Sequence, residues 1–90
     1  MTLPETVGEP ILVQASFTPE GAVQPAAFIW RDRTRTIASV GREWEEESEG
    51  IPFRCWLVQT PNAETFELRL DTAGLRWILA RAWLNAAALT

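Results

Sequence analysis

Two short runs of β-forming residues, separated by a turn sequence, constrain the fold of this chain more than any other feature. The runs are residues 53–58 and 66–70, and residues 60–63 lie between them with Pro61 and Asn62 at the centre. Proline and asparagine are typical of the central positions of β-turns. The segment therefore predicts a β-hairpin.

A turn centred on Pro61 and Asn62 would place Thr60 opposite Ala63, and this register sorts the side chains into two faces. We expect the apolar face to lie in the core, with Leu57, Phe66 and Leu68 nearly fully buried. The pairs on this face are Phe53 with Leu70, Cys55 with Leu68, and Leu57 with Phe66. The pairs on the other face are Arg54 with Arg69, Trp56 with Glu67, and Val58 with Thr65.

The first half of the chain predicts further strands. Residues 1–10 contain Pro4, Gly8 and Pro10 and no apolar pattern, so we expect a flexible N-terminal segment, followed by a single β-rich domain over residues 11–90. The expected strands are residues 11–17, 26–30 and 34–40, with turns at residues 18–21 and 31–33.

Residues 42–50 hold five of the twelve acidic residues and are too acidic for a buried strand. We expect this segment to be a solvated lid, attached to the body of the domain by Trp44. Ile37, Val40 and Trp44 also have the spacing of a helical turn. A cation site is disfavoured, because the run lacks the alternating ligands and central Gly of a calcium loop.

Residues 71–74 begin with Asp and end with Gly, which predicts a three-residue hairpin loop with Asp71 opposite Leu75. Residues 75–83 are then the last strand, although they also fit the apolar spacing of an amphipathic helix. The register of this strand stays open, because a slip of one residue would place Leu75, Trp77 and Leu79 on the core side. Residues 84–90 are expected to form a short helix or to fray.

Length and composition bound the class of protein. Ninety residues make one domain near the lower limit for a self-sufficient core. The single Cys55 excludes an internal disulfide, which fits a reducing compartment. No apolar run has the length of a signal peptide or of a membrane span. We therefore expect a cytoplasmic protein with no membrane partner.

The residues that ordinary enzyme chemistry needs are missing. The sequence has no His, Lys or Tyr, which removes the commonest general bases and the amine nucleophile. One Cys without His cannot form the usual zinc site, and there is no glycine-rich phosphate loop. We expect no catalytic residues, no metal site and no cofactor.

The candidate binding residues are arginines and tryptophans, a pairing enriched at interfaces. In the expected register Arg54 and Arg69 are adjacent on the face away from the core and Trp56 flanks them. Such a surface could bind a protein or single-stranded nucleic acid. The alternative is that the tryptophans form the core and the arginines pair with surface acids, which the net charge of −4 favours over phosphate binding. The full candidate set is Trp30, Arg31, Arg33, Arg54, Trp56, Arg69 and Trp77, with Arg35 beside it.

Several short motifs resemble a family of small uncharacterised bacterial β-rich proteins that contain an F-x-W-R-G-R hairpin, a V-x-x-V-x-x-x-W segment and a closing W-x-L strand. The matching residues are 28–33, Ile37, Val40, Trp44, Trp56, Val58, 66–68, Asp71, Trp77, Leu79 and Trp83. The chain departs from the family at Asp32, where Gly is favoured, and at Arg35, where an aromatic residue is usual. The resemblance implies an association with error-prone Y-family DNA polymerase proteins and thus an accessory role in DNA repair.

These features together predict an all-β domain of five or six antiparallel strands in a meander, curled into a small open barrel with an acidic lid. The expected function is a non-catalytic interaction module that binds a protein, and a protein of DNA repair is the expected partner. The second hypothesis is a single-stranded nucleic-acid-binding domain, and the third is a degenerate small-molecule barrel. The sequence does not specify an oligomeric state.

Overall fold

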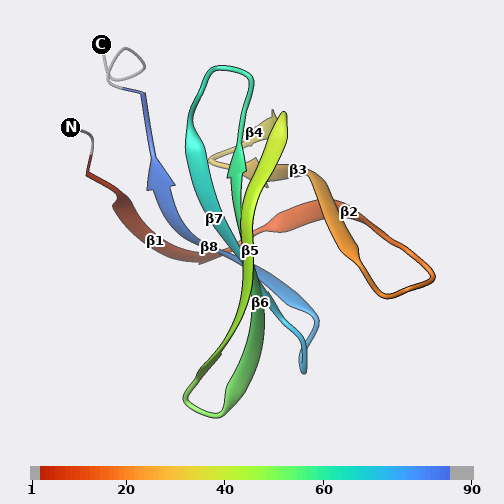
Figure 1. Cartoon of the computed structure of the whole chain (residues 1–90). Helices are drawn as coiled ribbons and strands as arrows, with labels where there is room; N and C mark the ends of the chain where they lie inside the picture. Colours follow the sequence, from red (N-terminus) through yellow and green to blue (C-terminus); the bar gives the residue numbers. More distant parts are fainter. Residues whose placement is uncertain (1–2, 86–90) are drawn as a thin grey trace.

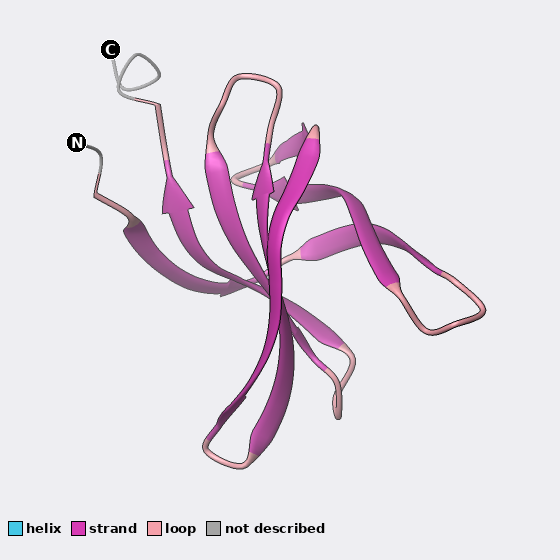
Figure 2. Cartoon of the chain, in the orientation of Figure 1, coloured by secondary structure: helices cyan, strands magenta, loops and turns pink. Residues whose placement is uncertain are grey.

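The computed structural model describes residues 3–85, which form eight β-strands in two antiparallel sheets and contain no helix (Figures 1 and 2). The strands are β1 (Glu5–Pro10), β2 (Leu12–Phe17), β3 (Val23–Trp30), β4 (Arg33–Thr36), β5 (Ser39–Ser48), β6 (Ile51–Gln59), β7 (Thr65–Asp71) and β8 (Arg76–Trp83). The five-stranded sheet has the order β1-β8-β7-β6-β5, and the three-stranded sheet has the order β2-β3-β4. The all-β class is confirmed, whereas the curled barrel is wrong because neither sheet closes.

The three-stranded sheet follows the expected elements closely. β2 and β3 are joined by the predicted turn at residues 18–21, where the Gly21 amide donates to the Thr18 carbonyl. Trp30 pairs with Arg33, so Arg31 and Asp32 alone form the next turn. Both have positive φ, 52° and 59°, which gives the two-residue turn that suits the twist of a hairpin.

The expected strand at residues 34–40 is in fact divided between the two sheets. β4 ends at Thr36, and β5 begins at Ser39 in the other sheet. The two residues between them bond to different sheets, since the Ile37 amide donates to the Ala26 carbonyl and the Ala38 amide to the Gln59 carbonyl. This crossing produces two layers instead of a continuous meander.

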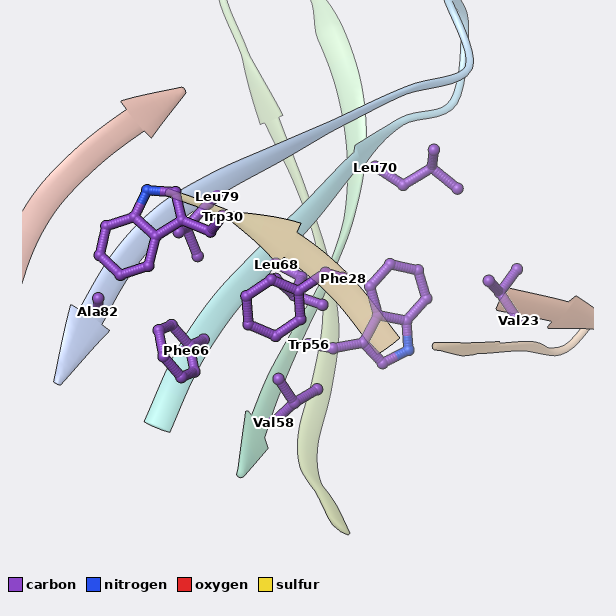
Figure 3. Packing of buried hydrophobic residues seen from close by; sticks show 10 residues of the cluster. All are labelled: Val23, Phe28, Trp30, Trp56, Val58, Phe66, Leu68, Leu70, Leu79 and Ala82. Carbon is purple, nitrogen blue, oxygen red and sulfur yellow. The ribbon is translucent and has the colours of Figure 1, made fainter. Parts of the chain in front are cut away.

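The core lies between the two sheets, where aromatic side chains from both layers meet (Figure 3). Phe66 of β7 packs edge to face against Phe28 and Trp30 of β3, with ring centroids 5.0 and 5.9 Å apart. We call the face of the five-stranded sheet that covers this core its inner face, and the opposite face its outer face. The buried apolar cluster is Val23, Phe28, Trp30, Trp56, Val58, Phe66, Leu68, Leu70, Leu79 and Ala82.

The predicted central hairpin exists, but its register is wrong by one residue. Thr60 pairs with Glu64, because Ala63 adopts φ 65° and lengthens the loop to three residues. The shift exchanges the faces of β6, so that Val58 lies opposite Phe66 and Trp56 opposite Leu68. Phe66 and Leu68 are fully buried as predicted, whereas Leu57 is only half-buried on the outer face.

The last hairpin is a strand hairpin, not a helix. Asp71 pairs with Arg76, because Leu75 also has positive φ, 56°, and lies in the loop. Trp77 and Leu79 therefore lie on the inner face, as expected for the register slipped by one residue. Leu75, which that register also placed on the core side, is 73% exposed. The expected C-terminal helix or frayed end falls mainly on residues 86–90, which lie outside the described residues.

Two segments predicted to lack regular structure are edge strands. The N-terminal segment contains β1, which pairs with β8. The acidic lid is β5, which pairs with β6 up to a two-residue turn at Glu49 and Gly50. Glutamates fit an edge strand because both of its faces can be solvated and their charge prevents pairing with another chain.

Candidate functional site

The structure divides the predicted binding residues between the core and three separate surfaces. Trp30 and Trp56 are buried, with 3% and 0% of their area exposed, and both belong to the core. Trp77 is half-buried, and its ring centroid is 5.2 Å from that of Trp56. These three tryptophans therefore stabilise the fold, as the alternative interpretation of the sequence held.

Arg54 and Arg69 do not form the predicted pair, because the register places them on opposite faces. Arg54 lies on the inner face, donates to the Gly21 carbonyl at 3.1 Å and pairs with Glu43 at 2.9 Å. It thereby connects the five-stranded sheet to the turn between β2 and β3. Arg69 lies on the outer face, with its guanidinium 4.3 Å from the centre of the Phe53 ring.

The arginines of the β3–β4 hairpin form a third group. Arg31 pairs with Glu5 and stacks on the Trp30 ring at 4.1 Å. Arg33 is exposed. Arg35 is largely buried, and its pKa is lowered by burial and by the charge of Arg33, while Glu64 at 3.6 Å opposes the shift.

A hollow lies on the outer face of the five-stranded sheet, and we call it the outer groove. Its volume is about 530 Å³. The three-stranded sheet packs on the other face, so the groove is open. It is lined by Thr6, Gly8, Arg42, Trp44, Glu46, Leu57, Glu67, Arg69, Ile78, Ala80, Arg81 and Trp83.

The alternation of side chains along β5, β6, β7 and β8 builds most of this groove, and Thr6 and Gly8 of β1 complete its edge. Trp44 and Glu46 project from β5, Leu57 from β6, and Glu67 and Arg69 from β7. A bulge in β8 leaves Ala80 without a partner, between Leu79 opposite Leu68 and Arg81 opposite Glu67. The extra residue shifts the alternation of side chains. Ile78 and the bulged Ala80 lie on the outer face, and so do Arg81 and Trp83 after the bulge.

Glu46 organises one side of the groove by accepting hydrogen bonds from two neighbours and forming an ion pair with a third. The Trp44 indole donates to it at 3.0 Å, the Cys55 thiol at 3.5 Å, and an Arg69 nitrogen lies 3.3 Å from its other oxygen. The hydrogen bond from Trp44 is the main cause that holds the pKa of Glu46 below its usual range. Glu46 is therefore an anionic anchor that fixes the Trp44 ring and the Arg69 guanidinium.

The other side of the groove contains a second ion pair, formed by Glu67 and Arg81 at 2.8 Å. The Glu67 side chain is 6% exposed and that of Arg81 is 52% exposed, so the pair presents its cation to the solvent. Arg42 stacks on the Trp44 ring at 4.7 Å. Three arginines and two glutamates give the groove a net charge of +1 on a chain whose net charge is −4.

Cys55 lies beneath this network and is fully buried. Burial raises the pKa of its thiol from 9.0 to about 11, and the neighbouring Glu46 carboxylate adds to the shift. The thiol is thus protonated at neutral pH, when it donates its weak hydrogen bond to Glu46.

Of the groove residues, only Arg69 belonged to the predicted set. Trp44 was predicted as a lid anchor and Trp83 as part of the last strand. The sequence signal for the groove is the spacing of two residues between Trp44 and Glu46 and between Glu67 and Arg69, which places each pair on one face of a strand. The first pair becomes visible as a signal once the acidic run is recognised as a strand. The bulge at Ala80 has no equivalent signal in the sequence.

Two kinds of site are not found in the structure. No three Cys, Asp or Glu residues within residues 3–85 converge into an arrangement that would hold a metal ion. The same part of the chain has no helix long and apolar enough to cross a membrane.

Comparison with known proteins gives one match. A family model described as a domain of unknown function, DUF6504, matches residues 1–84. No curated protein and no solved structure matches the chain.

Proposed function

The chain belongs to the DUF6504 family, and we propose that it is a non-catalytic interaction module whose outer groove binds a segment of a partner protein. The observation that carries the proposal is the groove itself. It combines Trp44, Trp83 and three arginines with the apolar side chains of Leu57 and Ile78 on an uncovered sheet face. Tryptophan and arginine are the residues most enriched among the energetic hot spots of protein interfaces.

The groove is also organised in advance, which favours binding. Glu46 holds both the Trp44 indole and the Arg69 guanidinium, and the rigid strands fix the distance between β5 and β8 at about 14 Å, three strand spacings. Side chains that are already ordered lose less conformational entropy when a partner binds. A partner segment would contact the rings of Trp44 and Trp83 without rearranging the sheet.

The charges favour a protein over a nucleic acid as the partner. Glu46 and Glu67 place two carboxylates within the groove, and β5 carries three more, Glu43, Glu45 and Glu47, on its other face. A polyanion would be repelled by these groups, whereas a peptide with both polar and apolar side chains could match them. The resemblance to proteins associated with Y-family DNA polymerases makes such a polymerase the first partner to test.

Single-stranded nucleic acid is the second candidate, favoured by one observation. Arg42 stacks on the Trp44 ring, and Arg69 and Arg81 continue a line of cations across the groove. Aromatic rings with arginines are the usual contacts for unpaired bases and their phosphates.

Affinity measurements on matched variants distinguish the two candidates. Trp83→Ala and Arg42→Glu should each weaken capture of the purified Y-family polymerase by roughly 30-fold or more, as expected of hot-spot residues. Arg33→Glu, an exposed change of the same charge on the other sheet, should leave it unchanged.

The same proteins are then titrated with a single-stranded oligonucleotide. We expect no binding at moderate salt. Oligonucleotide binding that falls steeply with salt and is lost in Arg42→Glu would replace the first proposal by the second.

A further inference from the structure

The free edge of β2 differs from the other three free edges of the two sheets. Natural sheets protect their edges with charges, prolines, bulges or short strands. Among residues 3–85, β1 has two glutamates, Pro10 and a bulge, β4 has only four residues of which two are Arg, and β5 has four glutamates. β2 has six residues, Leu-Val-Gln-Ala-Ser-Phe, with no charge and no proline, and the irregularity in its ladder with β3 has its extra residue, Ala26, on β3.

The same strand exposes large apolar side chains. Leu12 is 69% exposed and Phe17 is 63% exposed, and Ile29 beside Leu12 on β3 is 40% exposed. A mostly apolar hollow of about 420 Å³ begins at this edge and extends across the three-stranded sheet; it is lined by Leu12, Val13, Gln14, Ala27, Phe28, Ile29 and Thr34. An uncharged edge beside apolar side chains is the combination that favours addition of another strand.

We propose that β2 pairs antiparallel with β2 of a second copy of the chain, which joins two three-stranded sheets into one sheet of six strands. A second copy fits because self-pairing of this strand brings no like charges together. Self-pairing of β5 would set glutamates against glutamates, and that of β4 arginines against arginines. A domain of 90 residues also gains from additional buried area.

The sequence of β2 supports a specific register for this pair. With the two-fold axis at Ala15, Phe17 of each copy lies opposite Val13 of the other. Residues that lie opposite each other in an antiparallel pair point to the same face of the sheet. Residues 13, 15 and 17 share one face of β2, so a two-fold axis perpendicular to the sheet at Ala15 satisfies this condition. This register covers the exposed Phe17 ring with an apolar side chain. Because a single strand pair buries a small area, we expect a reversible dimer.

Sedimentation equilibrium over about 5 to 500 µM tests the proposal, since this range covers the affinities of small interfaces. The intact chain should show a concentration-dependent dimer. Ser16→Lys places a charge on the β2 edge and should raise the dissociation constant by roughly tenfold or more. Thr36→Lys, a change at an exposed position on the opposite edge of the same sheet and outside the apolar hollow, should not alter it.

A second measurement does not depend on the stability of the variants. In a mixture of labelled and unlabelled chains, isotope-filtered NMR should show contacts between the Val13 methyl groups and the Phe17 ring of different copies. A chain that stays monomeric at the highest concentration would overturn the proposal. A dimer that is unaffected by Ser16→Lys, or that lacks these contacts, would overturn it as well.

Discussion

Replacing Phe66 with Ala tests how the two sheets are held together. Phe66 is fully buried at the centre of the core, and its ring meets those of Phe28 and Trp30 from the other sheet. Loss of a buried Phe side chain costs about 3 to 5 kcal/mol, including the cavity that it leaves. A domain of this size has about 5 to 13 kcal/mol of unfolding free energy, so the variant should be marginally folded.

The free energy of unfolding, measured by urea denaturation and by thermal melting followed with circular dichroism, gives the comparison. At about 4 to 8 °C per kcal/mol, the melting temperature of Phe66→Ala should fall by at least about 12 °C. Two neighbouring changes on β6 serve as controls for the register. Val58→Ala, at a fully buried position, should cost about 2 kcal/mol, and Leu57→Ala, at a half-buried one, about 1 kcal/mol.

The refuting results are specific. A Phe66→Ala protein that melts within two degrees of the parent would show that the ring does not join the two sheets. A larger loss for Leu57→Ala than for Val58→Ala would show that the faces of β6 are exchanged relative to this structure.

Three further predictions concern the Cys55 thiol and the Asp71 carboxylate. Because the pKa of Cys55 is raised from 9.0 to about 11, its thiolate fraction at pH 8 should be about 100-fold smaller in the folded chain than in the denatured chain. Alkylation by iodoacetamide should therefore be at least about 100-fold slower before denaturation than after it. Equal rates would show that the thiol is exposed. The same raised pKa means that the folded state binds the thiol proton more tightly than the unfolded state does. The contribution of this proton to stability is therefore complete below pH 9 and is lost as the pH rises through about 11. Urea denaturation at pH 8, 9 and 10.5 should detect the loss. The Asp71 carboxylate accepts from the Ala73 and Gly74 amides, both at 2.9 Å, so Asp71→Ala should cost about 1 to 3 kcal/mol in urea denaturation, whereas Glu20→Ala at an exposed turn should cost nothing measurable.

The existence of most strands could be predicted from the sequence, because alternation and turn residues are local signals. The registers of the last two hairpins could not, because their loops place Ala63 and Leu75 at positive φ, where Gly or Asn is usual. Ala63 and Leu75 have no intrinsic preference for this conformation, and the packing of Phe66 and Leu68 selects it. A register error of one residue then reverses every side chain on the strand.

That reversal explains why the predicted binding residues separated. Arg54 and Arg69 were expected side by side, and the shift of one residue sends Arg54 to the inner face and leaves Arg69 in the outer groove. The acidic run was misjudged for a different reason. Its charge density excludes a buried strand but suits an edge strand, and only the pairing of β5 with β6 distinguishes the two.

The most direct test of the proposed function is fluorine NMR of the chain labelled with 5-fluorotryptophan, titrated with a Y-family polymerase. The five tryptophans divide into two in the outer groove, Trp44 and Trp83, and three that stabilise the fold, Trp30, Trp56 and Trp77. Each signal is assigned by a Trp→Phe variant. If the outer groove binds the polymerase, the signals of Trp44 and Trp83 should shift or broaden while the other three stay in place. Binding that leaves both groove signals unchanged, or an absence of binding, would contradict the proposed function.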